Sequence, residues 1–371
     1  MSKNKKEVSA CPMKKTSIGG QALIEGIMMK GPKKVSMAVR NPEGEMVIEN
    51  WDVDQSAKPK IYTLPFLRGI FGFIDSMKFG YKCLMRSAEI AGLEDEPASS
   101  KPKEARVDED TAVKDEITTE NNNLPEGNEM LTCDCKADKK SSDSSISPWM
   151  MNLIMVIASV LGVVLALLLF KALPEVLYEL LVKLIPALEG NGYGYSLIRA
   201  VFIGIIKIAI LVAYMLLVSL MKEIKRTFMY HGAEHKSIMC YEKGLELTVE
   251  NVRMQKRFHP RCGTSFLILM MLVGIVITMF IPAELSSNGA VNVILRTLIS
   301  LALLPLMMSI GYELIKIAGK HDNWFTRLIS APGLWLQRIT TKEPEDGMIE
   351  CAITALKNVI PDDGSDEWNR K

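Results

Sequence analysis

The chain has 371 residues, a formal net charge of +1 and a mean hydropathy of +0.15, with 48% hydrophobic and 23% charged residues. A near-neutral charge argues against nucleic acid as the partner, because proteins that bind phosphate backbones carry a basic excess. Seven scattered cysteines argue against a secreted fold held by disulfides, so reduced thiols are expected. A positive hydropathy at this charge content indicates that very apolar segments alternate with charged ones.

Residues 1–60 are predicted to form a small β-rich element. Two strand-like runs, residues 36–40 and 45–50, flank the sequence Asn-Pro-Glu-Gly at 41–44, which is a strong turn signal. The preceding residues, 18–32, contain four glycines around Glu25. Two interpretations are open for this segment. The glycines could let a ligand approach the backbone beside Glu25, or they could form a tight turn that leads into the hairpin.

The segment 61–91 is predicted to be an amphipathic helix that lies on a membrane surface or packs against other helices. Its apolar residues recur at helical spacing, but charged residues interrupt them too often for a membrane span. Residues 92–148 are predicted to be a disordered acidic linker. Acidic residues, Ser, Thr, Asn and Pro dominate there, and apolar runs are absent.

The region 149–315 predicts a mainly α-helical, multi-pass membrane domain. Four apolar stretches approach the length that crosses a bilayer: 149–170, 197–221, 266–283 and 291–315. Lys207 lies inside the second stretch, where an ionisable residue is a functional candidate by default. No acidic residue is evident at matching depth, so snorkelling of Lys207 toward the headgroups is the favoured interpretation.

The distribution of basic residues predicts how this domain is oriented. The loop 222–264 carries about nine Lys and Arg residues, whereas the loop after the third stretch carries none. By the positive-inside rule, the basic loop and both termini are cytoplasmic, which suits a protein of the plasma membrane. The lipid bilayer is then the first partner. Residues 316–371 predict a cytoplasmic segment, with a Trp-rich helix at the membrane surface and an amphipathic helix over 346–361.

The sequence His-Gly-Ala-Glu-His at 231–235 is the main candidate for chemistry. His231 and His235 stand one turn apart on one face of a helix, a geometry that suits a single metal ion. Glu234 completes the order H-x-x-E-H of inverted zinc peptidases, in which the glutamate is the general base. A divalent metal, with zinc as the first candidate, would need a third ligand. The candidates for it are His259, Cys262, His321, Asp322 and Cys240.

Other interpretations of the same residues stay open. The histidines could cap helix carbonyls or bind headgroups, and a catalytic Cys–His arrangement is also compatible with the sequence. The nearby cations Lys236, Arg257 and Arg261 could bind anionic groups of a substrate or simply the anionic inner leaflet.

Five segments together resemble the bacterial family called domain of unknown function 1385: GGQALIEGIMMKGP, LPFLRGIFGFIDSM, YHGAEHKSIMCYEKG, RFHPRCGTSF and GKHDNW. Members of this family are described as predicted metal-dependent enzymes of the membrane. The resemblance covers most of the chain outside the linker and the ends, and it implies a membrane protein with a metal site. The positions to which it directs attention are Glu25, His231, Glu234, His235, His259, Cys262, His321 and Asp322.

The leading hypothesis is therefore a metal-dependent membrane enzyme, most plausibly a hydrolase, with Glu234 as its general base. His231 and His235 would bind the metal, with His259 or His321 completing the set. The substrate would be a segment of a membrane protein or a lipid-linked phosphate. The rival hypothesis is a non-enzymatic scaffold or assembly factor, in which the same residues form a structural metal site or a hydrogen-bonded cluster.

Overall fold

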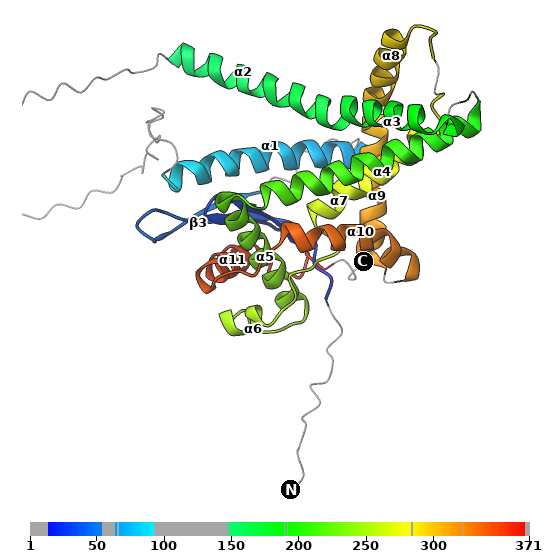
Figure 1. Ribbon diagram of the computed structural model, residues 1–371. Helices are drawn as coiled ribbons and strands as arrows, with labels where there is room; N and C mark the ends of the chain where they lie inside the picture. The colour runs from blue at the N-terminus through cyan, green and yellow to red at the C-terminus, as the bar shows by residue number, and fades with distance from the viewer. Residues whose placement is uncertain are drawn as a thin grey trace, which may run out of the picture. The chain divides into compact units, whose positions relative to one another are not determined.

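The computed structural model describes residues 14–53, 64, 67–92, 148–188, 190, 192–282, 285–321 and 323–367 (Figure 1). The predicted linker, except for residues 92 and 148, lies outside the described residues. The chain divides into two units. One comprises residues 96–164, and the other comprises residues 1–95 with 165–371. The described residues are mainly helical, with an antiparallel sheet at the N-terminal end.

The N-terminal element is a four-stranded sheet whose strands follow one another in chain order. Its strands are β1 (Gly19–Leu23), β2 (Gly26–Lys30), β3 (Lys34–Arg40) and β4 (Met46–Asp52). The prediction of a hairpin at 36–50 is confirmed by β3 and β4, in which Val39 pairs with Val47. The glycine-rich segment forms a second hairpin, β1–β2, which precedes the predicted one. Glu25 lies in its two-residue connection with φ at +50°.

The sheet is buried on both faces because its apolar side chains alternate with the pleat. Along β3, Val35, Met37 and Val39 face one way and pack around Cys83 of helix α1 (Leu67–Ile90). Ala38 faces the other way, into the core formed with helices α5 (Lys222–Glu242) and α11 (Asp346–Val359). The sheet therefore lies between α1 and the α5–α11 pair (Figure 1).

Helix α1 confirms the predicted amphipathic segment. One side of it packs on the sheet and another packs on helix α9 (Leu304–Lys320). A bidentate ion pair fastens this second contact, with Arg68 Nε 2.7 Å from Glu313 Oε1 and Nη2 2.5 Å from Oε2. The sequence left open whether this helix lies on a membrane surface or packs against other helices. The structure shows that it packs against α9.

The apolar helices correct the prediction of four spans. The first apolar segment runs through α2 (Pro148–Leu167), the π-helical turn η2 (Leu168–Ala172) and α3 (Leu173–Leu184). Its stretch Val156–Leu184 and helix α4 (Tyr193–Val218) are long and apolar enough to cross a membrane. Helix α7 (Gly263–Thr278) has only 16 residues, or about 24 Å of rise, which falls short of the hydrocarbon thickness.

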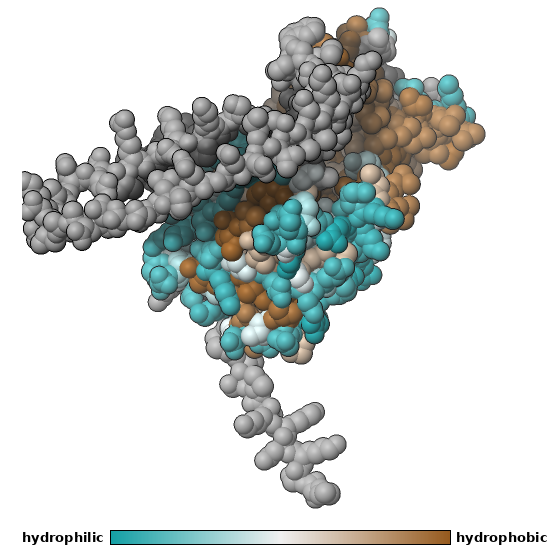
Figure 2. Space-filling view, turned by 90° about the vertical axis from the view of Figure 1, so that its left-hand side faces the viewer, coloured by the Kyte–Doolittle hydropathy of each residue, from teal (hydrophilic) through white to brown (hydrophobic). Residues whose placement is uncertain are grey.

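The predicted fourth span is a bent pair of helices. Helix α8 (Gly289–Ala302) and α9 meet at an angle of 43°. Pro305 lies in the first turn of α9, and a proline there has no N–H to continue the preceding helix. The described helices therefore contain two spans, or three if the bent pair counts as one. Figure 2 shows hydrophobic surface gathered over the layer of apolar helices and mostly hydrophilic surface away from it.

The C-terminal segment forms two helices, as predicted. Helix α10 (Trp324–Thr340) exposes Trp324 and Trp335 and buries Leu336 against Leu211 of α4 and Ile268 of α7. Short helix α6 (Val249–Arg253) follows α5. Helix α11 occupies the core beneath the sheet, and its buried residues include Ile349, Ala352 and Leu356. It thus packs against both the sheet and α5, the helix that carries the histidine pair.

One close contact holds α5 against the segment that follows α10. The Lys342 N–H donates to the Phe228 carbonyl at 2.9 Å, and a Cβ at Gly232 would lie 2.0 Å from the Lys342 carbonyl oxygen. We expect Gly232→Ala to destabilise the protein by about 1–3 kcal/mol, because backbone rather than a flexible side chain must move. The thermal unfolding midpoint of the protein in detergent measures this.

Gly72→Ala in α1 is the matched control, since no atom lies within 4 Å of the added Cβ. This substitution should be neutral or stabilising by up to about 1 kcal/mol, from helix propensity alone. Equal unfolding midpoints for the two variants would contradict the close approach at Gly232.

Candidate functional site

Helix α5 places two histidines side by side. His231 and His235 are four residues apart, so they lie one turn apart on the same face, and their ring centroids are 4.4 Å apart. The C-terminal half of α5 is almost wholly buried. His235 is 1% exposed, and His231 is the more accessible of the pair. The predicted helical placement of these two residues matches the structure.

The N-terminus of α7 brings a thiol to the same place. Cys262 is the N-cap residue of α7, and its sulfur accepts a hydrogen bond from the Thr264 N–H at 3.5 Å. The loop before it is held by Gln337 of α10, which is fully buried. The Gln337 side chain accepts from the His259 N–H at 2.9 Å and donates to the His259 carbonyl at 2.7 Å. This amide therefore sets the position from which α7 and its N-cap begin.

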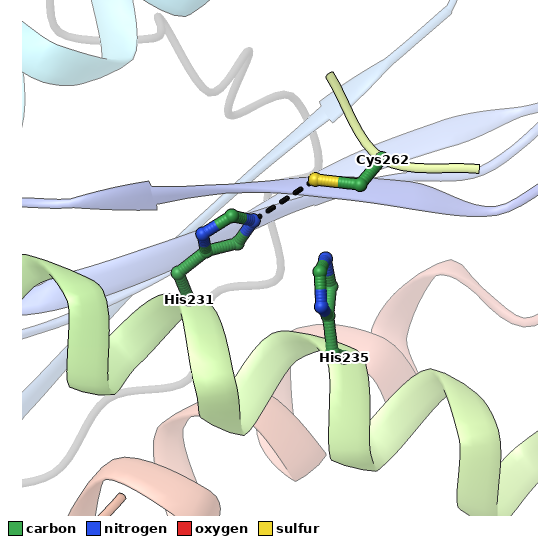
Figure 3. Close-up of side chains that lie close together, drawn as sticks. All are labelled: His231, His235 and Cys262. Carbon is green, nitrogen blue, oxygen red and sulfur yellow. Dashed lines mark hydrogen bonds between the residues drawn. The ribbon is translucent and has the colours of Figure 1, made fainter. Parts of the chain in front are cut away.

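The two imidazoles and the thiol converge on one point (Figure 3). His231 Nε2 lies 3.1 Å from Cys262 Sγ, and one ligand atom from each of the three residues lies within 4.8 Å of the others. Among the residues that the structure describes, this is the group of His, Cys, Asp or Glu side chains that fits a single metal ion.

Both histidines are oriented by backbone carbonyls. His231 Nδ1 lies 2.9 Å from the Thr340 carbonyl oxygen, and His235 Nδ1 lies 2.6 Å from that of Arg257. A carbonyl oxygen can only accept, so each Nδ1 carries a proton and each Nε2 faces the centre, where it has a lone pair for a metal whenever the ring is neutral. Histidines that bind metals are commonly held this way, by a hydrogen bond from the other ring nitrogen.

The donor set fits a divalent metal. His235 Nε2 is buried and has no hydrogen-bond partner among the described residues, an arrangement that is costly unless something occupies the lone pair. Zinc takes nitrogen and thiolate ligands at about 2.0–2.3 Å, which puts tetrahedral ligands roughly 3–4 Å apart. The 3.1 Å between His231 Nε2 and Cys262 Sγ agrees with that spacing, and a set of three protein ligands leaves a fourth tetrahedral position open.

The charges of the centre favour a thiolate. Burial raises the pKa of Cys262, but the positive charge of His231 and its hydrogen bond to the sulfur outweigh burial and hold the pKa well below its usual range. For His231, burial lowers the pKa, whereas the Cys262 charge and hydrogen bond raise it more, to about 9. The metal-free centre is therefore a thiolate–imidazolium pair, and the thiolate is the form that binds metal.

Glu234 stands beside this centre on the same helix. It is 5% exposed, and the Gly20 N–H of β1 donates to its Oε1 at 3.1 Å. A Cβ at Gly20 would lie 2.8 Å from the Glu234 Cγ, so the glycine-rich strand does provide a close backbone approach. Burial raises the pKa of Glu234 despite the opposing charges of the histidines. A raised carboxyl pKa suits a general base or acid near neutral pH.

Two other candidate ligands lie near the centre but are engaged elsewhere. His259 Nε2 faces Glu242 Oε2 at 3.3 Å, although its ring centroid is 5.8 Å from that of His235. Burial lowers the pKa of His259, which therefore stays neutral as a hydrogen-bond partner of Glu242. Cys240 lies in the core beneath the sheet, and its sulfur is 3.5 Å from the Glu246 carbonyl oxygen.

The structure places the remaining candidates farther away. Glu25 forms an ion pair with Arg226 and accepts from the Tyr230 hydroxyl at 3.3 Å, so it lies at α5 but outside the ligand group. His321 is exposed immediately after α9 and is also outside the group. Asp322 lies outside the described residues.

The three cations near the centre are paired within the protein. Lys236 Nζ lies 2.5 Å from Glu343 Oε2, and Arg257 Nη1 lies 2.7 Å from Oε1 of the same residue. Arg261 pairs with Glu242. These three cations therefore contact carboxylates of this chain.

Several contributors to the centre have no signature in the sequence. The Thr340 carbonyl is 109 residues from His231, and the Gln337 amide is 78 residues from His259. Backbone carbonyls carry no residue identity, so sequence patterns do not reveal them. Gln337 is one of several polar residues on an amphipathic helix, so its local sequence does not single it out.

The metal-free protein should show a thiolate at about pH 7, below the usual thiol pKa of about 8.5. We expect wild type to exceed Cys262→Ser in the ultraviolet absorbance of the thiolate, and His231→Gln to lose most of that excess, because the stabilising positive charge is gone. Cys240→Ser is the control, since burial raises the pKa of Cys240 and keeps it protonated. An absorbance that appears only above the usual thiol pKa would contradict the ion pair.

Comparison with known proteins agrees with the motifs. The family described as "Protein of unknown function (DUF1385)" matches residues 64–362, which include the three converging side chains and Glu234. Uncharacterized protein YqhQ of Bacillus subtilis (strain 168) is 30% identical over 357 residues, which are 95% of this chain and 95% of that protein. No solved structure matches the chain. The resemblance seen in the sequence is thus confirmed, and the chain belongs to the DUF1385 family.

Proposed function

We propose that this protein is a metal-dependent membrane enzyme of the hydrolase class, with a divalent metal, zinc as first candidate, held by His231, His235 and Cys262. The observation that carries the proposal is the convergence of two carbonyl-oriented Nε2 atoms on one sulfur, with His235 Nε2 buried and without a partner among the described residues. A thiolate–imidazolium dyad would use only His231. A metal would use all three side chains.

Each residue has a distinct role in this proposal. When bound, the metal would supply Lewis-acid chemistry at its open fourth position. Glu234, with its raised pKa, would accept a proton on a carboxylate oxygen from the attacking water and return it to the leaving group. The Gly20 N–H would hold that carboxylate in place. The Thr340 and Arg257 carbonyls would keep both Nε2 lone pairs directed at the metal.

The proposal places the centre at the cytoplasmic face of the plasma membrane. The basic segment 222–264, which carries all three ligands, follows the apolar helix α4 directly, and basic loops stay in the cytoplasm. Both termini would be cytoplasmic if the chain crosses an even number of times. The substrate would be a segment of a membrane protein or a lipid-linked phosphate, since the centre lies next to apolar helices.

A second candidate function rests on how deeply the centre is buried. His235 and Cys262 are 1% and 9% exposed, and the centre joins α5, the start of α7 and the end of α10. A closed structural metal would use the same residue types. The protein would then be a scaffold or assembly factor, and its metal would fasten three elements together.

Metal content tests the centre first. We expect wild-type protein, purified in detergent, to carry close to one divalent metal per chain by elemental mass spectrometry. The His231→Ala/His235→Ala double variant should lose it, because a single thiolate does not retain the ion. Cys262→Ser should lose most of it, since a hydroxyl is a far weaker zinc ligand.

His321→Ala is the matched control, because His321 is exposed and outside the ligand group. This variant should keep the wild-type metal content. A wild-type protein that stays metal-free after reconstitution with zinc, manganese or iron would overturn the proposal and favour Cys–His chemistry.

Glu234→Gln separates the enzyme from the scaffold. We expect the variant to keep its metal and fold, because the amide is isosteric and can still accept from Gly20. Turnover should fall by about 10²–10⁴-fold, the usual contribution of a general base. The assay uses two probes: a fluorescently labelled membrane-protein segment and a lipid-linked diphosphate. Turnover at the wild-type rate would remove Glu234 from the chemistry, and a metal-replete wild type inert on both probes would favour the scaffold.

A further inference from the structure

A second group of charges lies among the apolar helices, away from the histidine centre. Four cations form it, and we call them the cationic cluster: Lys171 on η2, Arg199 and Lys207 on α4, and Arg296 on α8. Among the described residues, Glu175 of α3 is the one carboxylate whose negative charge attracts all three of Lys171, Lys207 and Arg296. The group therefore has three positive charges in excess.

One ion pair anchors the cluster. Helix α3 packs against α4 (Figure 1), and Arg199 Nη2 donates to Glu175 Oε2 at 2.6 Å, with both side chains mostly shielded. The Arg199 guanidinium also lies over the ring of Tyr178, 5.4 Å from its centroid. Arg199 Nε is buried and has no hydrogen-bond partner among the described residues. The guanidinium is thus held rigidly with one donor unused.

Arg296 repeats this pattern from another helix. Its Nη1 donates to the Pro282 carbonyl at 2.5 Å, while its Nε is buried without a partner among the described residues. Arg296 lies close enough to Arg199 and Lys171 for their charges to repel it. Each of these two neighbouring arginines therefore keeps a buried Nε donor unused.

The two lysines complete the cluster without ion pairs of their own. In the part of the chain that the structure describes, neither Lys171 nor Lys207 has a salt-bridge partner within 4 Å, although Glu175 attracts both. Lys207 lies fourteen residues into α4, or roughly 21 Å along its axis. Lys171 lies in a π-helical turn, a rare conformation that is frequent at functional sites.

Such a charge excess is unfavourable inside apolar surroundings. Like charges repel strongly at low dielectric, and ionisable residues at membrane depth mark ligand or ion pathways. The sequence alone favoured snorkelling of Lys207 because no acidic partner was evident. The structure adds that Glu175 lies close enough for its charge to attract Lys207 and that Arg296 lies close enough to repel it. Among the residues that the structure describes, one carboxylate cannot balance four cations, so the cluster can accept an anion from outside the chain.

We propose that the cationic cluster binds the phosphate group of an anionic membrane lipid. Arginine donors match the oxygens of a phosphate in number and direction, and the lysines add mobile charge. Apolar helices around the cluster, exposed at positions such as Val176, Leu180 and Ile205, would contact the acyl chains. The inference rests on the membrane part of the proposed function and is independent of the metal.

The test measures lipid binding to the full-length chain in neutral detergent by native mass spectrometry. Phosphatidylglycerol and phosphatidylcholine are added separately. They carry the same phosphodiester, but only the first has a net negative charge. We expect at least tenfold stronger retention of phosphatidylglycerol. The Lys207→Met/Arg296→Met variant should reduce that retention about tenfold or more, because two charged donors are lost.

The control is Lys183→Gln, which removes the same charge from an exposed position in the last turn of α3. It should leave retention unchanged. Equal retention of the two lipids, or equal losses in Lys183→Gln and the double variant, would overturn the proposal. An excess of inorganic phosphate that displaces phosphatidylglycerol would support a phosphate site but assign it to the soluble ion.

A further variant guards against loss by misfolding. Glu175→Gln removes the competing carboxylate, so we expect phosphatidylglycerol to bind several-fold tighter, which a misfolded protein cannot do. Weaker binding in this variant would contradict the proposed balance of charges. Thermal unfolding checks the fold of each variant. Metal content at His231 should be unchanged in all of them, so failure here is distinguishable from failure of the metal proposal.

Discussion

Two hydrogen bonds, from the Nδ1 atoms of His231 and His235 to backbone carbonyls, determine what the centre of this protein can do. They keep a proton on each Nδ1 and turn both Nε2 atoms toward the Cys262 sulfur. The carbonyls belong to Thr340 and Arg257, which come from the end of α10 and the loop before α7. The chemistry of α5 therefore depends on how two other parts of the chain pack around it.

The packing that supplies these carbonyls is itself held by close approaches and by one buried amide. Gly232 admits the backbone of Lys342, which follows Thr340 by two residues. Gln337 satisfies both backbone groups of His259 and so positions the loop that leads to Cys262. A buried backbone group without a partner costs about 1–3 kcal/mol, so the amide restricts this loop to one arrangement. The result is a centre that is organised before any ligand arrives.

The two charged regions follow opposite electrostatic rules. At the histidine centre, a negative sulfur and a positive imidazole stabilise each other, and a carboxylate is kept beside them by a backbone N–H. Among the apolar helices, four cations share one carboxylate and retain unused donors. A charged group in low-dielectric surroundings is destabilising unless a group of opposite charge pairs with it. The first region is nearly balanced within the chain, whereas the second calls for an anion from outside.

The amino-acid sequence was enough to predict those helices and strands that local periodicity identifies. It predicted the strands of the β3–β4 hairpin, the amphipathic α1, the apolar stretches, and the one-turn spacing of His231 and His235, because side chains four residues apart must share a helix face. Only tertiary structure decided that Cys262 joins them while His259 turns to Glu242 and His321 stays exposed. It also decided that the charge of Glu175 acts on Lys207 and that the last apolar stretch bends before Pro305. These outcomes depend on packing between residues far apart in the chain, which no local pattern encodes.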